Sequence, residues 1–480
     1  MTPTPVSPVP NTIRLATNER KTWVSELRSA KVGFQSGLVT GEKSIINWGI
    51  FIFALYAISW ILPSSLVGFL RPLYLLNSLI FAPIAFSKAK IPIRWSFPII
   101  FVMALQLWSF FTQAHAIAAL GRIGALGRPE LYLMEALVPC FVAYALVAVD
   151  PRARNPLMLM VLWAFGLSCF IAYAQFMRLG FAMRIAEAYT YKSIDNWDGA
   201  AGLRAVGLTP QPNQLAFQCI IGFGLLASRL FISKLKTTDL IGMFFFSGGV
   251  VSSQARAAYI VLFVMWIAFM IGLFRTDKKL ARRIVAIGCA CLVIVAGFAA
   301  KRFTYLSHSV SDQKDASVSF RENLTWSQLD TIYPRLAMTG IGPDAGLMLG
   351  TGPEDKWVED GRIMESGYRL MIAMYGLPGL AIFVIGLVGS AASAARLLID
   401  RYQTPERRQF AGIGLTATVF MMINCNFFNT IDGYMILPFS LMIAGLSMGI
   451  ALRSPSRFTL MREHHESKAP NKTLASINTA

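Results

Sequence analysis

Twelve apolar runs, each long enough to cross a bilayer as an α-helix, constrain this chain more than any other feature. Inside a membrane every backbone N–H and C=O group needs a partner, so runs of this length predict spanning helices. Their approximate limits are 44–61, 66–86, 95–113, 130–149, 156–177, 213–233, 239–253, 257–274, 283–300, 366–390, 409–428 and 433–452. Composition agrees, because 55% of the residues are hydrophobic and only 15% are charged. We therefore expect an all-α polytopic membrane protein with about twelve transmembrane helices.

Basic residues mark one side of this membrane domain, which we place at 44–452. They gather in alternate loops: Lys88, Lys90 and Arg94; Arg152 and Arg154; Arg229, Lys234 and Lys236; Arg275, Lys278, Lys279, Arg282 and Arg283; Arg396, Arg401, Arg407 and Arg408. The positive-inside rule predicts that these loops and both tails, 1–43 and 453–480, are cytoplasmic, and that loops 178–212 and 301–365 are external. The formal net charge of +18 is then explained by basic residues that orient the helices in the membrane. We therefore expect no nucleic acid partner.

The loop 301–365 is the longest stretch without a membrane-length apolar run. From Ser319 its apolar residues recur at roughly helical spacing, which predicts a short amphipathic helix that begins near Arg321 and contains Trp326. Glycines on both sides of Asp344 then predict a tight turn. We therefore expect a large external loop with short helices between the ninth and tenth spans.

Three arginines lie on the side of the membrane that the positive-inside rule depletes of them: Arg204, Arg256 and Arg321. An arginine fork grips phosphate oxygens bidentately, and each charge-assisted hydrogen bond contributes roughly 1.5 to 3 kcal/mol. Asn213 and Ser253 are plausible N-caps beside two of these arginines, where helix N-termini would add backbone donors to an anion site. This pattern favours a lipid pyrophosphate as ligand. The alternative is that the arginines contact lipid headgroups or lie extended at helix ends.

These residues belong to a series of short motifs: Arg204-Ala205-Val206-Gly207, Gln211-Pro212-Asn213, Ser253-Gln254-Ala255-Arg256-Ala257-Ala258, Arg321 with Trp326, Gly340-Ile341-Gly342, and Glu365-Ser366-Gly367-Tyr368 before Gly376. In this order and spacing, over roughly residues 204–386, the chain resembles the O-antigen ligase and Wzy-type polysaccharide polymerase superfamily. The resemblance implies a GT-C-like membrane glycosyltransferase of the bacterial inner membrane. It would take a glycan from undecaprenyl pyrophosphate on the periplasmic face, and Arg204 and Arg256 would hold the pyrophosphate.

The remaining candidate residues supply the other tasks of such a reaction. Glu365, at the membrane edge, would act as the general base that deprotonates an acceptor sugar hydroxyl. Arg321 would assist catalysis or orient the acceptor, Trp326 would stack on a sugar ring, Tyr368 would hydrogen-bond the glycan, and Asp344 would contact substrate. Direct attack would invert the anomeric carbon. The external loops hold no cluster of acids at metal-ligand spacing, so we expect neither a metal nor a cofactor.

The polymerase branch of the superfamily is favoured over the ligase branch. Ligases carry a His-Asn pair where this chain has Glu365-Ser366. A polymerase would extend lipid-linked repeat units of O-antigen, capsule or exopolysaccharide, with a flippase and a chain-length regulator as further partners. A ligase would instead transfer the glycan to lipid A-core. A twelve-span secondary transporter is the third alternative, in which Arg71 and Glu135 would be a coupling pair instead of a buried structural ion pair.

Overall fold

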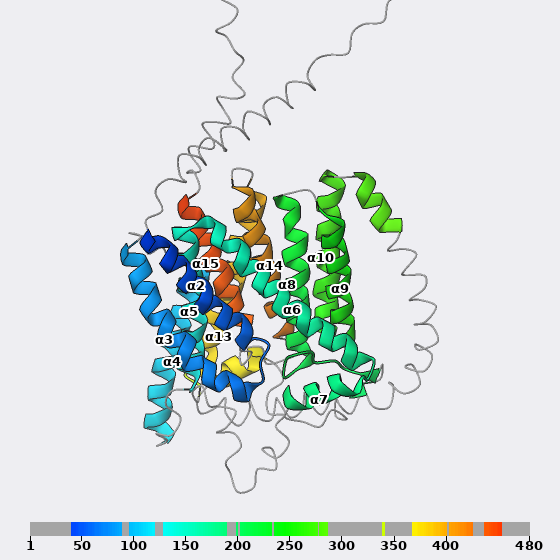
Figure 1. Cartoon of the computed structure of the whole chain (residues 1–480). Helices are drawn as coiled ribbons and strands as arrows, with labels where there is room; N and C mark the ends of the chain where they lie inside the picture. The colour runs from blue at the N-terminus through cyan, green and yellow to red at the C-terminus, as the bar shows by residue number, and fades with distance from the viewer. Residues whose placement is uncertain are drawn as a thin grey trace, which may run out of the picture.

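The protein is a bundle of long helices (Figure 1). Its computed structural model describes residues 40–88, 96–120, 128–189, 198–199, 202–232, 235–276, 278–286, 338–340, 367–400, 403–425 and 436–453. Within these residues six helices are long and apolar enough to cross a membrane, and three shorter apolar helices accompany them. The expected all-helical, multi-pass membrane protein is confirmed at this level.

Most helices begin and end close to the expected spans. The long ones are α2 (Thr40–Ser59), α3 (Ser64–Lys88), α4 (Phe97–Leu120), α5 (Arg128–Val149), α6 (Arg154–Phe176), α8 (Pro212–Ala227), α9 (Thr237–Ser253), α10 (Arg256–Thr276), α13 (Gly367–Ile399), α14 (Pro405–Asn424) and α15 (Ile436–Arg453). Two of them, α4 and α13, run well past their expected ends. The expected ninth span lies almost entirely outside the described residues.

Smaller elements complete the described chain. The 3-10 helices η1 (Pro151–Ala153) and η3 (Ser228–Phe231) precede α6 and follow α8. Within the expected loop 178–212, the chain forms the short helix α7 (Gly180–Tyr189) and an antiparallel pair of two-residue strands, β1 (Asp198–Gly199) and β2 (Gly202–Leu203). These elements were not predicted from the sequence.

A cluster of aromatic rings joins three helices and the residue that follows α2 in the middle of the bundle. Phe439 of α15 lies 5.9 Å, centroid to centroid, from Trp60, from Phe165 of α6 and from Phe217 of α8. Phe165, Phe217 and Phe439 are fully buried. Ring pairs at this separation stabilise a core beyond the area they bury, so the cluster ties helices that are distant in sequence.

Helices α5 and α15 approach each other through glycines. A Cβ atom built on Gly445 would lie 2.2 Å from the carbonyl oxygen of Cys140, and one on Gly449 would lie 2.9 Å from the carbonyl oxygen of Tyr144. The two glycines are four residues apart on one face of α15, the spacing that lets membrane helices pack backbone to backbone. No side chain fits at Gly445.

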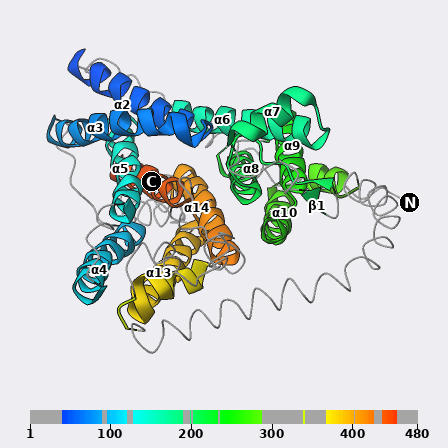
Figure 2. The ribbon, with the colours of Figure 1, turned by 90° about the horizontal axis from the view of Figure 1, so that it is seen from below.

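The helix directions define two ends of the bundle. At the basic end, where α6, α9 and α14 begin, Arg154 pairs with Glu406 at 3.4 Å and Arg229 pairs with the buried Asp239. At the α7 end, α6 and α9 end while α8, α10 and α13 begin. Figure 1 shows α7 lying across this end, and Figure 2 views the bundle from that side. Helix α14 packs against α8 and α10 on one side and against α13 and α15 on the other (Figure 2).

A hydrogen bond fastens α7 to the rest of the bundle. The hydroxyl of Tyr189, the last residue of α7, donates to the carbonyl oxygen of Ile61. Burial raises the pKa of the Tyr189 phenol to about 12, so the group remains a protonated donor at physiological pH. The end of α7 is therefore held against the residues that follow α2.

Candidate functional site

The segment 204–209, which we call the Arg204 segment, is held at the α7 end by Gln175 of α6. The side-chain oxygen of this fully buried glutamine accepts hydrogen bonds from the backbone N–H groups of Val206, at 3.0 Å, and Gly207, at 2.7 Å. Its side-chain nitrogen donates to the carbonyl oxygen of Gly207 at 2.9 Å. One side chain therefore satisfies three backbone groups of a segment that has no regular secondary structure.

Gly207 makes the turn of this segment. Its φ of +62° lies in the left-handed region, and a Cβ atom built on it would lie 2.7 Å from the carbonyl oxygen of Ser168. The Ser168 hydroxyl accepts from the N–H of Leu208 at 3.0 Å, and the Thr209 hydroxyl donates to the carbonyl oxygen of Val206 at 2.6 Å. Both hydroxyl-bearing residues are fully buried. The backbone that carries Arg204 is therefore rigid.

The Arg204 segment lies beside the turn between α9 and α10. The backbone N–H of Ala205 donates to the carbonyl oxygen of Ser252 at 3.0 Å. That turn passes through Gln254, in a left-handed conformation with a φ of +52°, to Arg256, the first residue of α10. The partly buried Arg204 is also close enough to Tyr259 of α10 for its charge to act on the phenol. Two of the predicted pyrophosphate-binding segments are thus neighbours.

The expected N-caps beside these arginines are wrong. Gln211 is the N-cap of α8, with an extended backbone, and Pro212 is the first helical residue, so Asn213 lies inside the helix. The reason is that Pro212 has no N–H to lose at the first helical position. Ser253 is the last residue of α9, and its hydroxyl donates to the carbonyl oxygen of Val250 at 2.7 Å.

The start of α13 is anchored on the end of α14. The N–H of Gly367 donates to the carbonyl oxygen of Cys425 at 2.8 Å, and the hydroxyl of Tyr368 donates to the carbonyl oxygen of Met422 at 2.9 Å. The Tyr368 ring also packs edge-on against Phe383 at 6.1 Å. Because its proton is used internally, Tyr368 can offer only its oxygen lone pairs to a ligand.

Two glycines lock the residues 338–340 onto a kink in α13. Gly340 and Gly376 have φ values of +71° and +69°, and Gly376 interrupts the helical geometry of α13. A Cβ atom on Gly340 would lie 2.5 Å from the Met374 carbonyl oxygen, and one on Gly376 would lie 2.5 Å from the Met338 carbonyl oxygen. The indole N–H of Trp108 on α4 donates to the carbonyl oxygen just before Gly376 at 2.6 Å. This contact holds the chain on both sides of the segment that carries Asp344 and Glu365.

The other predicted site residues lie outside the description that the structure provides. They are Arg321, Trp326, Asp344 and Glu365, together with the side chains of Arg256 and Glu135. Of the predicted set, the structure brings the segments of Arg204 and Arg256 together and places Asn213 and Tyr368 at the same end of the bundle. The roles of all these residues remain predictions.

Sequence reasoning missed Gln175 and Ser168, the two side chains that position the Arg204 segment. A signal was present, since both are polar residues in an apolar span. They are seven residues apart, so they lie two turns apart on one face of α6. A polar pair of this kind predicts a face that contacts backbone groups and not lipid.

Comparison with known proteins identifies a family for the part of this site that follows the Arg204 segment in the sequence. A family model described as O-antigen ligase matches residues 241–384, a range from α9 to the middle of α13 that includes Arg256, Arg321, Glu365 and Tyr368. No curated protein matches the chain. Arg204 precedes the matched range but is tied to it through the hydrogen bond from Ala205 to Ser252. The family comprises membrane enzymes of the glycosyltransferase type that act in surface polysaccharide synthesis. Residues 241–384 are therefore an O-antigen ligase domain of the O-antigen ligase and polysaccharide polymerase superfamily.

Proposed function

We propose that this protein polymerises a bacterial surface polysaccharide. It transfers a glycan from undecaprenyl pyrophosphate to a sugar hydroxyl of a lipid-linked repeat unit, on the periplasmic face of the inner membrane. The proposed topology has about twelve spans in a GT-C-like arrangement, with both termini in the cytoplasm. The distribution of basic residues over alternate loops supports this orientation.

The rigid Arg204 segment beside the turn that leads to Arg256 is the observation that carries the proposal. Leaving-group charge grows on the pyrophosphate during glycosyl transfer, and preorganised donors stabilise such charge best because they need no rearrangement. Gln175 and Gly207 fix the backbone of Arg204, and the bond from Ala205 to Ser252 ties it to the Arg256 turn. Two arginines on fixed backbones are suited to a pyrophosphate.

The acceptor half of the reaction is assigned to residues near the start of α13. The acceptor oxygen attacks the anomeric carbon, the bond from that carbon to the pyrophosphate breaks, and the electron pair leaves with the pyrophosphate. Glu365 takes the hydroxyl proton, and Arg321 orients the acceptor or the leaving group. A single displacement of this kind inverts the anomeric carbon. The anchored backbone at Gly367 and Tyr368 supports this role for Glu365, which lies two residues before Gly367.

A ligase is the second candidate function. The description of the matching family as O-antigen ligase favours it, whereas Glu365-Ser366 in place of a His-Asn pair favours the polymerase. A transporter has no comparable support. Deleting the gene and sizing the surface glycan separates the two enzymes. A polymerase deletion leaves single repeat units on the cell surface, and a ligase deletion accumulates long polymer on its lipid carrier. The second pattern would contradict the proposal.

The pyrophosphate site is tested by Arg204→Lys and Arg256→Lys. Lysine keeps the charge but loses the planar fork, so we expect about a ten- to hundredfold loss of polymerisation at normal protein abundance. The matched control is Arg184→Lys on the exposed face of α7, at the same end of the bundle. Polymer chain lengths and immunoblots provide the measurement. Wild-type chain lengths in both site variants would remove the pyrophosphate assignment.

A further inference from the structure

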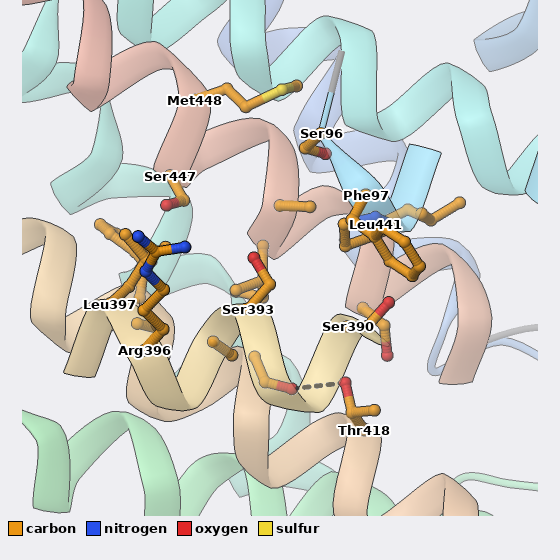
Figure 3. A pocket seen from close by; sticks show the side chains of 18 of the residues that line it. Ser96, Phe97, Ser390, Ser393, Arg396, Leu397, Thr418, Leu441, Ser447 and Met448 are labelled. Carbon is orange, nitrogen blue, oxygen red and sulfur yellow. Dashed lines mark hydrogen bonds between the residues drawn. The ribbon is translucent and has the colours of Figure 1, made fainter. Parts of the chain in front are cut away.

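A cavity of about 500 Å³ lies between α4, α13, α14 and α15 at the basic end (Figure 3). It is lined by the start of α4, the second half of α13 and most of the length of α14 and α15. The Arg204 segment lies at the opposite end of the bundle. A volume of this size is within the usual range of small-molecule sites, about 300 to 1,000 Å³.

Glycines of α13 shape one wall of this cavity. A Cβ atom on Gly389 would lie 2.1 Å from the ring of Phe97, and one on Gly386 would lie 2.3 Å from the ring of Phe101. The two rings of α4 therefore sit directly on the α13 backbone, which leaves them little freedom to move into the cavity. The wall is apolar and preformed.

Two buried hydroxyl groups without a hydrogen-bond partner in the described part of the chain line this cavity. Ser390 of α13 lines the cavity and is only 6% exposed, and its oxygen has no hydrogen-bond partner among the described protein groups. The buried oxygen of Ser96, which also lines the cavity, is in the same state. By contrast, Thr418 on the facing helix α14 donates to the carbonyl oxygen of Gly414 at 2.8 Å. A buried hydroxyl without a partner is unfavourable, so a ligand oxygen or donor at Ser390 would satisfy it.

The part of the cavity nearest the basic end of the bundle carries positive charge. Arg396 and Arg407 line it together with one carboxylate, Asp400. Arg407 uses one nitrogen to bond the side-chain oxygen of Gln403 at 2.7 Å, and Gln403 in turn donates to Asp400 at 3.1 Å. Two guanidinium groups against one carboxylate favour an anion, and a guanidinium matches phosphate oxygens in particular. Figure 3 shows Arg396 on the same side of the cavity as Ser393 of α13 and Ser447 of α15.

We propose that this cavity binds an anionic phospholipid from the leaflet at the basic end. The phosphate lies against Arg396 and Arg407, the ester oxygens reach the hydroxyls near Ser390, and an acyl chain fills the apolar part. The two arginines favour an anionic headgroup, and the apolar wall formed by Phe97 and Phe101 favours an acyl chain. Juxtamembrane arginines attract anionic lipids of the cytoplasmic leaflet, which is the leaflet that the topology proposed above assigns to this end.

The test measures binding of fluorescent phosphatidylglycerol to the purified full-length protein in a nonionic detergent. We expect saturable binding that unlabelled phosphatidylglycerol displaces, whereas phosphatidylcholine with the same chains and inorganic phosphate do not. In Arg396→Gln/Arg407→Gln the Kd rises about 25-fold, or about fivefold for each arginine. The matched control is Arg282→Gln, an exposed arginine at the same end that does not line the cavity, and its Kd stays at the wild-type value.

Ser390→Ala provides the second variant, because it removes only one atom and leaves both arginines in place. We expect its Kd to rise about fivefold while its thermal unfolding stays close to that of the wild type. The proposal is overturned if Ser390→Ala and the double variant both bind with the wild-type Kd. It is also overturned if phosphatidylcholine or inorganic phosphate displaces the probe as well as phosphatidylglycerol does. Neither result depends on the polymerase assignment, since the assay measures no glycan.

Discussion

At the scale of single residues, Gly207 sets the shape of the Arg204 segment. Its left-handed φ and its 2.7 Å approach to the Ser168 carbonyl oxygen both exclude a side chain. We expect Gly207→Ala to destabilise the protein by about 1 to 3 kcal/mol through backbone strain and to lower activity, because Arg204 moves with the segment. Thermal unfolding and glycan sizing measure the two effects. The matched control is Gly166→Ala in α6, where an added Cβ meets no atom within 4 Å, and its melting temperature should not fall.

The size of the activity loss in Glu365→Gln distinguishes two roles for Glu365. If Glu365 were only a helix-start carboxylate, its loss would remove about 0.3 to 1 kcal/mol of dipole interaction. If it is the general base, Glu365→Gln should reduce the polymerisation rate by roughly 10² to 10⁴ while donor binding is retained. An in vitro polymerisation assay with a lipid-linked repeat unit measures the rate. Glu187→Gln on exposed α7 is the control. A rate within about threefold of wild type would transfer the assignment to Asp344.

At the scale of secondary-structure elements, the crossing of α5 and α15 depends on Gly445. The Cys140 carbonyl oxygen, 2.2 Å from a built Cβ, belongs to a helix backbone and cannot rotate away. We expect Gly445→Ala to destabilise the protein by about 1 to 3 kcal/mol, although alanine is the better helix former. Thermal unfolding in detergent measures this change. Gly414→Ala on α14, where the nearest atom is a side-chain methyl at 3.5 Å, should be neutral or stabilising, and an equal loss in both variants would contradict the packing argument.

Element positions could be predicted from the sequence because apolar runs of membrane length have one stable conformation in lipid. The ranges expected for α5 and α9 differ from the observed ones by only two residues at the start and none at the end. Elements outside the spans were harder to predict. Helix α7 is short and amphipathic, so it gives no span signal, and the kink at Gly376 lies inside an uninterrupted apolar run. The N-cap at Gln211 follows from Pro212, because a proline favoured at the first helical position places the cap on the residue before it.

At the scale of the whole molecule, topology is the prediction with the widest consequences. We expect reporters fused after Ser319 and near Tyr191 to be external and those fused after Asp277 and Thr404 to be cytoplasmic, because basic residues remain on the cytoplasmic side. Paired alkaline phosphatase and fluorescent protein fusions measure this. An external signal at Asp277 would overturn the proposed orientation, and with it the proposed periplasmic location of the Arg204 segment.

The sequence predicts individual residues of the candidate site but not which segments lie next to each other. Residue chemistry alone predicts that Arg204 and Arg256 bind phosphate, because an arginine fork matches phosphate oxygens. That the two segments touch rests on the bond from Ala205 to Ser252, which joins the segment before α8 to the last turn of α9. Hydrophobic periodicity shows which face of a helix is buried but not which helix covers it. The support from Gln175 was missed for the same reason.

The contact between Gly340 and Gly376 has a consequence for how this protein can vary. In polymer terms it closes the chain between Gly340 and Gly376 into a ring, and because residues 367–375 of that ring belong to α13, only the stretch 341–366 is free to change in length. The entropy of closing such a ring grows slowly, by about 0.6 kcal/mol for each doubling of its length. Residues can therefore be added to the ring at small thermodynamic penalty, which would let related enzymes accommodate acceptors of different bulk. The two glycines where the ring closes admit no side chain. We therefore expect both positions to remain glycine while the residues between them vary.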